Sequence, residues 1–136
     1  MISRLLRERH HLSGPGDIVG FTYGPDTGKK EIAALAPILE EACALRDEAA
    51  LDIASKSAAA LVELVAALAG RLALAEGPLT LSGSVLLRNL YVRTAFDAQL
   101  AEQLPLMRIV PPRLHAAAGA AALALELSAA SAPEKQ

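Results

Sequence analysis

Two stretches of small residues could bring backbone N–H groups close to an anionic or polar ligand. Residues 82–85 have the sequence Ser-Gly-Ser-Val, and residues 116–121 hold Gly119 among five alanines. Each stretch lies where a strand or loop passes into a helix, so exposed N–H groups and the positive end of the helix could face the ligand. Gly83 has no Cβ, which lets a ligand or a neighbouring chain approach its backbone. Small residues here also suit tight helix-on-sheet packing, and the pattern alone leaves both interpretations open.

Three other motifs fall short of known patterns for phosphate or metal binding. Residues 24–30 have three residues between their glycines instead of the four of a P-loop, and no Ser or Thr follows the lysine. Residues 17–22 differ from a phosphate-binding Asp-x-Gly-x-Thr turn by one extra residue. His10 and His11 are adjacent and would point in different directions on a helix, and no carboxylate or cysteine is spaced to complete a site. The spacing therefore predicts no catalytic residue and no metal site in this chain.

Length and composition favour one soluble, cytoplasmic domain that binds neither nucleic acid nor membranes. A chain of 136 residues can bury one core but cannot form two lobes of ordinary size. The net charge of −2 and the 3% of aromatic residues provide neither a basic surface nor stacking rings for nucleic acid. Cys43 is the single cysteine, which suits a reducing cytoplasm. The most apolar run, residues 57–75, is interrupted by Glu63 and Arg71 and is too short to span a membrane.

The hydrophobic periodicity predicts one unit over residues 1–128, followed by a flexible tail at 129–136. Period-two alternation predicts a strand over residues 78–85, and a short apolar run predicts a second strand over residues 107–110. Pro37 removes a backbone donor, so we expect a break or kink beside it. Helical spacing predicts helices over residues 2–12, 29–45, 47–74, 89–104 and 115–127.

The order of these elements predicts a helix-rich α/β protein with a small, partly parallel sheet. Two strands joined by a helix of this length form a parallel pair with a right-handed crossover. Two strands cannot form a sheet that is covered on both faces. We therefore expect the chain to be part of a larger α/β domain or to complete its sheet with a partner.

Three stretches in a fixed order are similar to those of a known family. Residues 32–37 and Asp47 are similar to a helix pair with an alanine-rich run and a Gly-Asp step, although Arg46 stands where glycine is usual. Residues 79–85 are similar to an adenosine motif, a hydrophobic strand that ends in Gly-Gly or Gly-Ser. Residues 110–125 are similar to the closing strand, proline turn and Gly-Ala-rich helix. Together they resemble the carboxyl-terminal segment of the N-acetylglucosamine kinases and the related BadF/BadG/BcrA/BcrD ATPases, in the actin-like ATPase superfamily.

The resemblance implies an α/β fold that forms the carboxyl-terminal part of an actin-like (ribonuclease H-like) ATPase lobe. In the complete protein, ATP with Mg would lie between two lobes and a sugar would be the substrate. Gly83 and Ser84 would lie against the adenosine, and Gly119 would begin a helix close to the same region. The family's amino-terminal lobe, with its phosphate-binding turn, sugar-binding residues and catalytic aspartate, has no counterpart here and would be the missing partner. We therefore expect the nucleotide-binding portion of a sugar kinase, inactive alone.

Two alternatives remain open beside the sugar kinase. The long alanine and leucine face over residues 51–72, with the incomplete sheet, also predicts a non-catalytic interaction module or a homodimer. The other alternative is a fragment of a BadF-type ATPase activator. That branch usually carries an iron–sulfur cluster on cysteines, and Cys43 alone offers no such site, which favours the sugar kinase.

Overall fold

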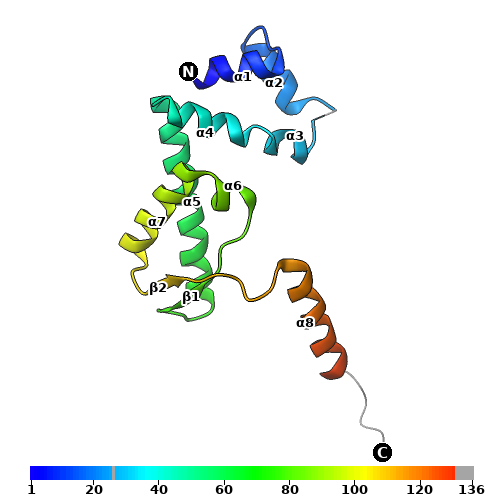
Figure 1. Ribbon diagram of the computed structural model, residues 1–136, viewed down its shortest axis with the longest axis vertical. Coiled ribbons are helices and arrows are strands. Elements are labelled where there is room, and N and C mark those ends of the chain that lie inside the picture. Colours follow the sequence, from blue (N-terminus) through cyan, green and yellow to red (C-terminus); the bar gives the residue numbers. More distant parts are fainter. Residues whose placement is uncertain (26, 131–136) are drawn as a thin grey trace, which may run out of the picture.

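The computed structural model, which describes residues 1–25 and 27–130, is a helix-rich α/β structure with one small sheet (Figure 1). Helices α4, α5, α6 and α7 and the sheet form its body, and α8 extends away from them. The elements in chain order are α1 (Ile2–His10), α2 (Pro15–Tyr23), α3 (Lys29–Ala33), α4 (Ala36–Ala44), α5 (Glu48–Arg71), β1 (Gly77–Leu79), α6 (Ser84–Arg88), α7 (Leu90–Gln103), β2 (Met107–Ile109) and α8 (Ala116–Ala130).

The two strands form a parallel pair, as the sequence predicts, with α6 and α7 as the crossover between them. Gly77 is opposite Met107 and Leu79 is opposite Ile109. The N–H of Val110 donates to the carbonyl of Leu79 over 2.9 Å and closes the pair. Both strands are shorter than expected. Strand β2 ends at Ile109, two residues before Pro111, so the residues that follow Leu79 have no neighbouring strand with which to form backbone hydrogen bonds.

The helix boundaries follow the local capping signals. The predicted helix over residues 29–45 is two helices, and α4 begins with Pro37 in its first turn, as expected from its missing N–H. Asn89 caps α7, since its Oδ1 accepts from the N–H of Val92 over 3.0 Å. Helix α6 was not expected, because its residues lie partly within the predicted strand over residues 78–85. Helix α8 continues to Ala130, into the segment predicted as a tail, and residues 131–136 lie outside the described part of the chain.

The core lies between α5 and α7. Ala50, Ala54 and Ala58 of α5 are buried, and their small side chains let α7 approach closely. Phe96 of α7 is 1% exposed and is among the largest fully buried side chains of the described residues. Burial of one such side chain contributes about 1.5–3 kcal/mol. Ile38, Ala42 and Cys43 of α4 extend this core.

Asp47 joins the first helix to the long central helix. Its Oδ1 accepts from the N–H of Ala50 over 2.9 Å and caps α5, while its Oδ2 accepts from the N–H of Ile2 over 3.1 Å. The same Oδ2 pairs with the amino group of Met1. The hydrogen bond from the Met1 amino group, followed by those from Ala50 and Ile2, lowers the pKa of Asp47 to about 2.

Within the described residues, α5 is the one helix whose length and composition would allow it to cross a membrane. The central helix of a soluble protein can have the same length and apolar composition as a helix that crosses a membrane. In this chain α5 packs along α7 and carries Asp52, Lys56 and Glu63. These features are compatible with a soluble protein.

Candidate functional site

The backbone at Gly83 takes a conformation that suits glycine. After β1, residues 80–82 continue without strand pairing and lead to Gly83, whose φ is 102° and ψ is 139°. Residues with a Cβ rarely adopt this combination. The carbonyl of Gly83 accepts from the N–H of Leu87 over 3.1 Å, so α6 starts directly at Ser84. Gly83 therefore turns the chain from the sheet into a helix within one residue.

A cavity of about 240 Å³ lies beside this turn, between residues of α3 and α4 on one side and of α6 on the other. We call it the α4–α6 cavity. In open α/β sheets, ligands bind outside the carboxyl ends of the strands. Its volume is below the roughly 300–1,000 Å³ of pockets that enclose a whole ligand, so it suits one part of a larger molecule. It is lined by Ala33, Ala36, Pro37, Glu40, Ser84, Val85, Arg88 and Asn89.

Asn89, one of the residues that line this cavity, has a buried side-chain donor without a partner. The side chain is 3% exposed, and its Oδ1 is occupied by the cap of α7. Its Nδ2 has no hydrogen-bond partner and is the one buried side-chain nitrogen or oxygen atom in the described residues without one. A buried donor left unpaired costs about 1–3 kcal/mol.

The other side chains that line the α4–α6 cavity are charged, polar or apolar. Glu40 on α4 provides a carboxylate and Arg88 on α6 a guanidinium, and neither forms an ion pair with any other described residue. Ser84 adds a hydroxyl at the start of α6, and Pro37 and Val85 add apolar surface. Apolar walls with a few polar groups of both kinds at the edge suit a flat ring that carries donors and acceptors.

No cysteine or histidine of the described chain lines the α4–α6 cavity. The one thiol near it, Cys43, is 1% exposed, and burial raises its pKa, as do the nearby Asp47 and Glu40. It therefore stays protonated and out of reach of a ligand. Of the described residues, no group of three or more His, Cys, Asp or Glu side chains could hold a metal ion.

The structure places Gly83 and Ser84 together but does not bring Gly119 to them. Ser84 lines the α4–α6 cavity, next to Gly83. Gly119 lies in α8, which extends away from the helices that form the cavity (Figure 1). Glu40, Arg88 and Asn89 were not singled out as site residues from the sequence. Arg88 lies four residues after Ser84, so the two share one face of α6, a signal that becomes visible only once residues 84–88 are known to be helical.

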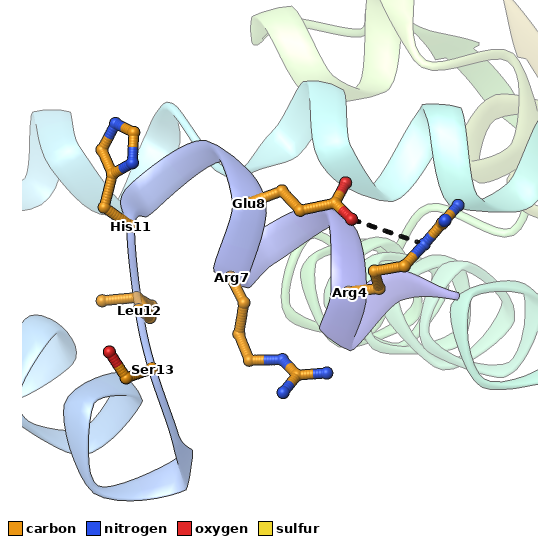
Figure 2. Close-up of a pocket in the computed structure, with 6 residues that line it drawn as sticks. All are labelled: Arg4, Arg7, Glu8, His11, Leu12 and Ser13. Carbon is orange, nitrogen blue, oxygen red and sulfur yellow. Dashed lines mark ion pairs between the residues drawn. The ribbon is translucent and has the colours of Figure 1, made fainter.

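A larger cavity, of about 360 Å³, lies at the amino-terminal end of the molecule, but its side chains diverge (Figure 2). Arg4 pairs with Glu8 over 3.8 Å on one side. Figure 2 shows the His11 ring on the opposite side of the helix end from Arg7. The ring of His10, the neighbour of His11, contacts the ring of Phe21 in a tilted arrangement, with ring centroids 4.7 Å apart. These residues form no converging set of ligands.

The remaining sequence motifs have local structural roles. Asp17 lies in the first turn of α2, where its Oδ2 accepts from the N–H groups of Ser13 and Gly14 over 2.7 and 3.2 Å. The N–H of Gly28 donates to Glu31 at the start of α3 over 2.8 Å. Asp26, within the P-loop-like stretch, lies outside the described residues.

Comparisons of the chain with protein-family models, with curated proteins and with solved structures found no match. The class that the structure itself defines is a helix-rich α/β protein with a two-stranded parallel sheet and a small cavity between α4 and α6.

Proposed function

We propose that this chain is the nucleotide-binding, carboxyl-terminal portion of an ATP-dependent sugar kinase that resembles the N-acetylglucosamine kinases, with an actin-like ATPase fold. The α4–α6 cavity would take the adenosine part of ATP. Three motifs in the family's order support the proposal, and the motif similar to the adenosine motif ends at this cavity. The observation that carries it is the unpaired Nδ2 of Asn89, a buried donor in a residue that lines the cavity.

The residues of the cavity match the edge groups of adenine. Asn89 would donate to a ring nitrogen, and the Glu40 carboxylate would accept from the exocyclic amino group. The guanidinium of Arg88 has a planar face that can stack on an aromatic ring. The absence of a Cβ at Gly83 would let the ribose lie close to the backbone.

The chemistry of phosphoryl transfer would come from a partner. Transfer depends on positioning the phosphates and on neutralising the charge that develops, tasks that need a phosphate-binding loop, a metal and a base. The α4–α6 cavity offers none of these. The amino-terminal lobe of the kinase would supply them together with the sugar site, so this chain alone would bind ATP weakly and turn over no substrate.

The decisive experiment distinguishes two roles of Asn89: its Nδ2 as a donor to a ligand and its Oδ1 as the cap of α7. Asn89→Asp keeps an oxygen that can cap α7 but removes the Nδ2 donor, whereas Asn89→Ala removes both. We expect Asn89→Asp to weaken adenosine binding about two- to tenfold, the worth of one hydrogen bond. Calorimetric titration with adenosine, ADP and ATP measures the affinity, and circular dichroism checks that α7 is retained.

Two results would count against the proposal. One is wild-type affinity for adenosine in both the Asn89→Asp and Asn89→Ala variants. The other is the absence of chemical-shift changes at Ala36, Ser84 and Arg88 when the labelled protein is titrated with adenosine.

A second candidate function is that of a helical interaction module. Several leucines of α5 are exposed, and α8 does not pack on the body of the molecule. A contiguous apolar surface on a soluble domain marks a site of association. This candidate does not exclude the first, because a nucleotide-binding chain can also self-associate.

A further inference from the structure

The carboxyl-terminal half of α5 has an apolar face that the molecule itself leaves open. Leu61 and Val65 are partly buried against the core, whereas Leu68 on the same face of α5 is 54% exposed. Together with Leu64 they line a groove of about 190 Å³ whose other wall is the segment after β1, including Leu81. No charged side chain lines this groove, which we call the α5 groove.

Helix α8 has the complementary properties. Among its residues Ala116–Ala130, Glu126 is the single charged one. Leu123 is 56% exposed, and with Ala116 and Gly119 it lies on one face at helical spacing. Small residues at two of these positions allow another helix to approach closely. The chain therefore carries an uncovered apolar helix and an uncovered apolar groove.

We propose that α8 of one copy of this chain packs into the α5 groove of a second copy, reciprocally, in a symmetric dimer. When each copy places its α8 in the α5 groove of the other, both apolar surfaces are buried and the assembly contains two copies. The inference rests on α5 and α8 alone and does not depend on nucleotide binding.

The charges beside the two faces set the direction of packing. Arg71 follows Leu64 by seven residues, and Glu126 follows Gly119 by seven residues. Parallel alignment of the helices thus places Gly119 beside Leu64, Leu123 beside Leu68 and Glu126 beside Arg71. Neither Arg71 nor Glu126 forms an ion pair with any described residue, so each is available to the other.

The linker before α8 favours a second copy over the chain's own groove. Residues 110–115 contain Pro111 and Pro112, and a residue before proline is held in an extended conformation. Figure 1 shows this linker leading α8 away from the body of the molecule. The two prolines stiffen the start of this linker, which opposes folding back and leaves α8 available to a neighbour.

Cysteine pairing tests the arrangement directly. In a Cys43→Ala background, one chain carries Leu68→Cys and another carries Leu123→Cys, both at exposed positions where substitution leaves the core intact. After mild oxidation, we expect the mixture of the two chains to form a disulfide-linked dimer and each chain alone to form far less. An unlinked mixture would overturn the proposal. So would a monomer with an internal disulfide in the chain that carries both cysteines, since α8 would then occupy its own groove.

Charge reversal provides an independent readout. We expect Arg71→Glu or Glu126→Arg alone to raise the dissociation constant of the dimer about two- to fivefold for each ion pair lost. The double variant should recover the wild-type value. Glu63→Arg is the matched control, because Glu63 lies on the opposite face of α5 from the groove. Sedimentation equilibrium measures the constants, and a wild-type protein that is monomeric at all concentrations would overturn the proposal.

Discussion

At the scale of single residues, Gly83 is the position where the backbone constrains the sequence most. Its φ of 102° excludes ordinary side chains, although a Cβ built there would meet no atom within 4 Å. The penalty for a substitution is therefore conformational and not steric. We expect Gly83→Ala to lower the free energy of unfolding by about 1–3 kcal/mol.

Gly70 in α5 is the matched control for Gly83. A Cβ there would also meet nothing within 4 Å, but the backbone is helical. Gly70→Ala should raise the free energy of unfolding by up to about 1 kcal/mol, because alanine loses less conformational entropy in a helix. Urea unfolding of the two variants measures both effects, and changes of the same sign would contradict this account.

The candidate site could be predicted from the sequence only in part. Gly83 and Ser84 were identifiable, because a glycine after an alternating apolar run indicates a strand end. The cap by Asn89 was also identifiable, since Asn is a preferred capping residue. Its unpaired Nδ2 and its place in the lining of the same cavity as Glu40 were not, because they depend on the tertiary arrangement of α4 and α6.

At the scale of elements, the long helices were predictable and the short ones were not. Helix α5 has a regular apolar stripe and an aspartate cap, which specify it locally. The strand over residues 78–85 was predicted too long because its alternation continues into α6, where tertiary contacts override the period-two pattern. Strand length was set by the partner strand, whose pairing ends before Pro111 and Pro112.

The end of α4 shows a local conflict between residue type and backbone. Arg46 has a φ of 57°, and the N–H of Asp47 bonds to the carbonyl of Ala42 over 3.0 Å, a helix ending that favours glycine. We expect Arg46→Gly to raise the free energy of unfolding by about 0.5–1 kcal/mol, since relief of the strain exceeds the added flexibility of the unfolded chain. Arg46→Ala, which keeps a Cβ, should give no such gain. Equal urea midpoints for Arg46→Gly and Arg46→Ala would contradict the prediction.

At the scale of the whole molecule, the sheet explains why so much apolar surface remains exposed. A parallel sheet is stable when helices cover both of its faces. Here α5 and α7 form the core of the body, and α8 extends away from it (Figure 1). The expectation of a partner came from counting strands, whereas surfaces such as the α5 groove, on which a partner could pack, are defined only by the folded structure.

The attachment of α1 to the body of the molecule should make its stability depend on acidity. The carboxylate of Asp47 pairs with the amino group of Met1 and accepts from the N–H of Ala50 in α5, and its pKa is lowered from 3.8 to about 2. Because the folded state favours the carboxylate, this contribution to stability is complete above about pH 4 and is lost as the pH falls toward 2. Asp47→Asn retains an oxygen that can cap α5 but loses the charge. We therefore expect the difference in urea midpoint between wild type and Asp47→Asn to be largest near neutral pH and to shrink toward zero near pH 2. Glu63→Gln, at an exposed position without an ion pair in the described residues, should unfold with the wild-type midpoint throughout. A pH-independent difference for Asp47→Asn would show that the charge of Asp47 contributes nothing to the connection between α1 and α5.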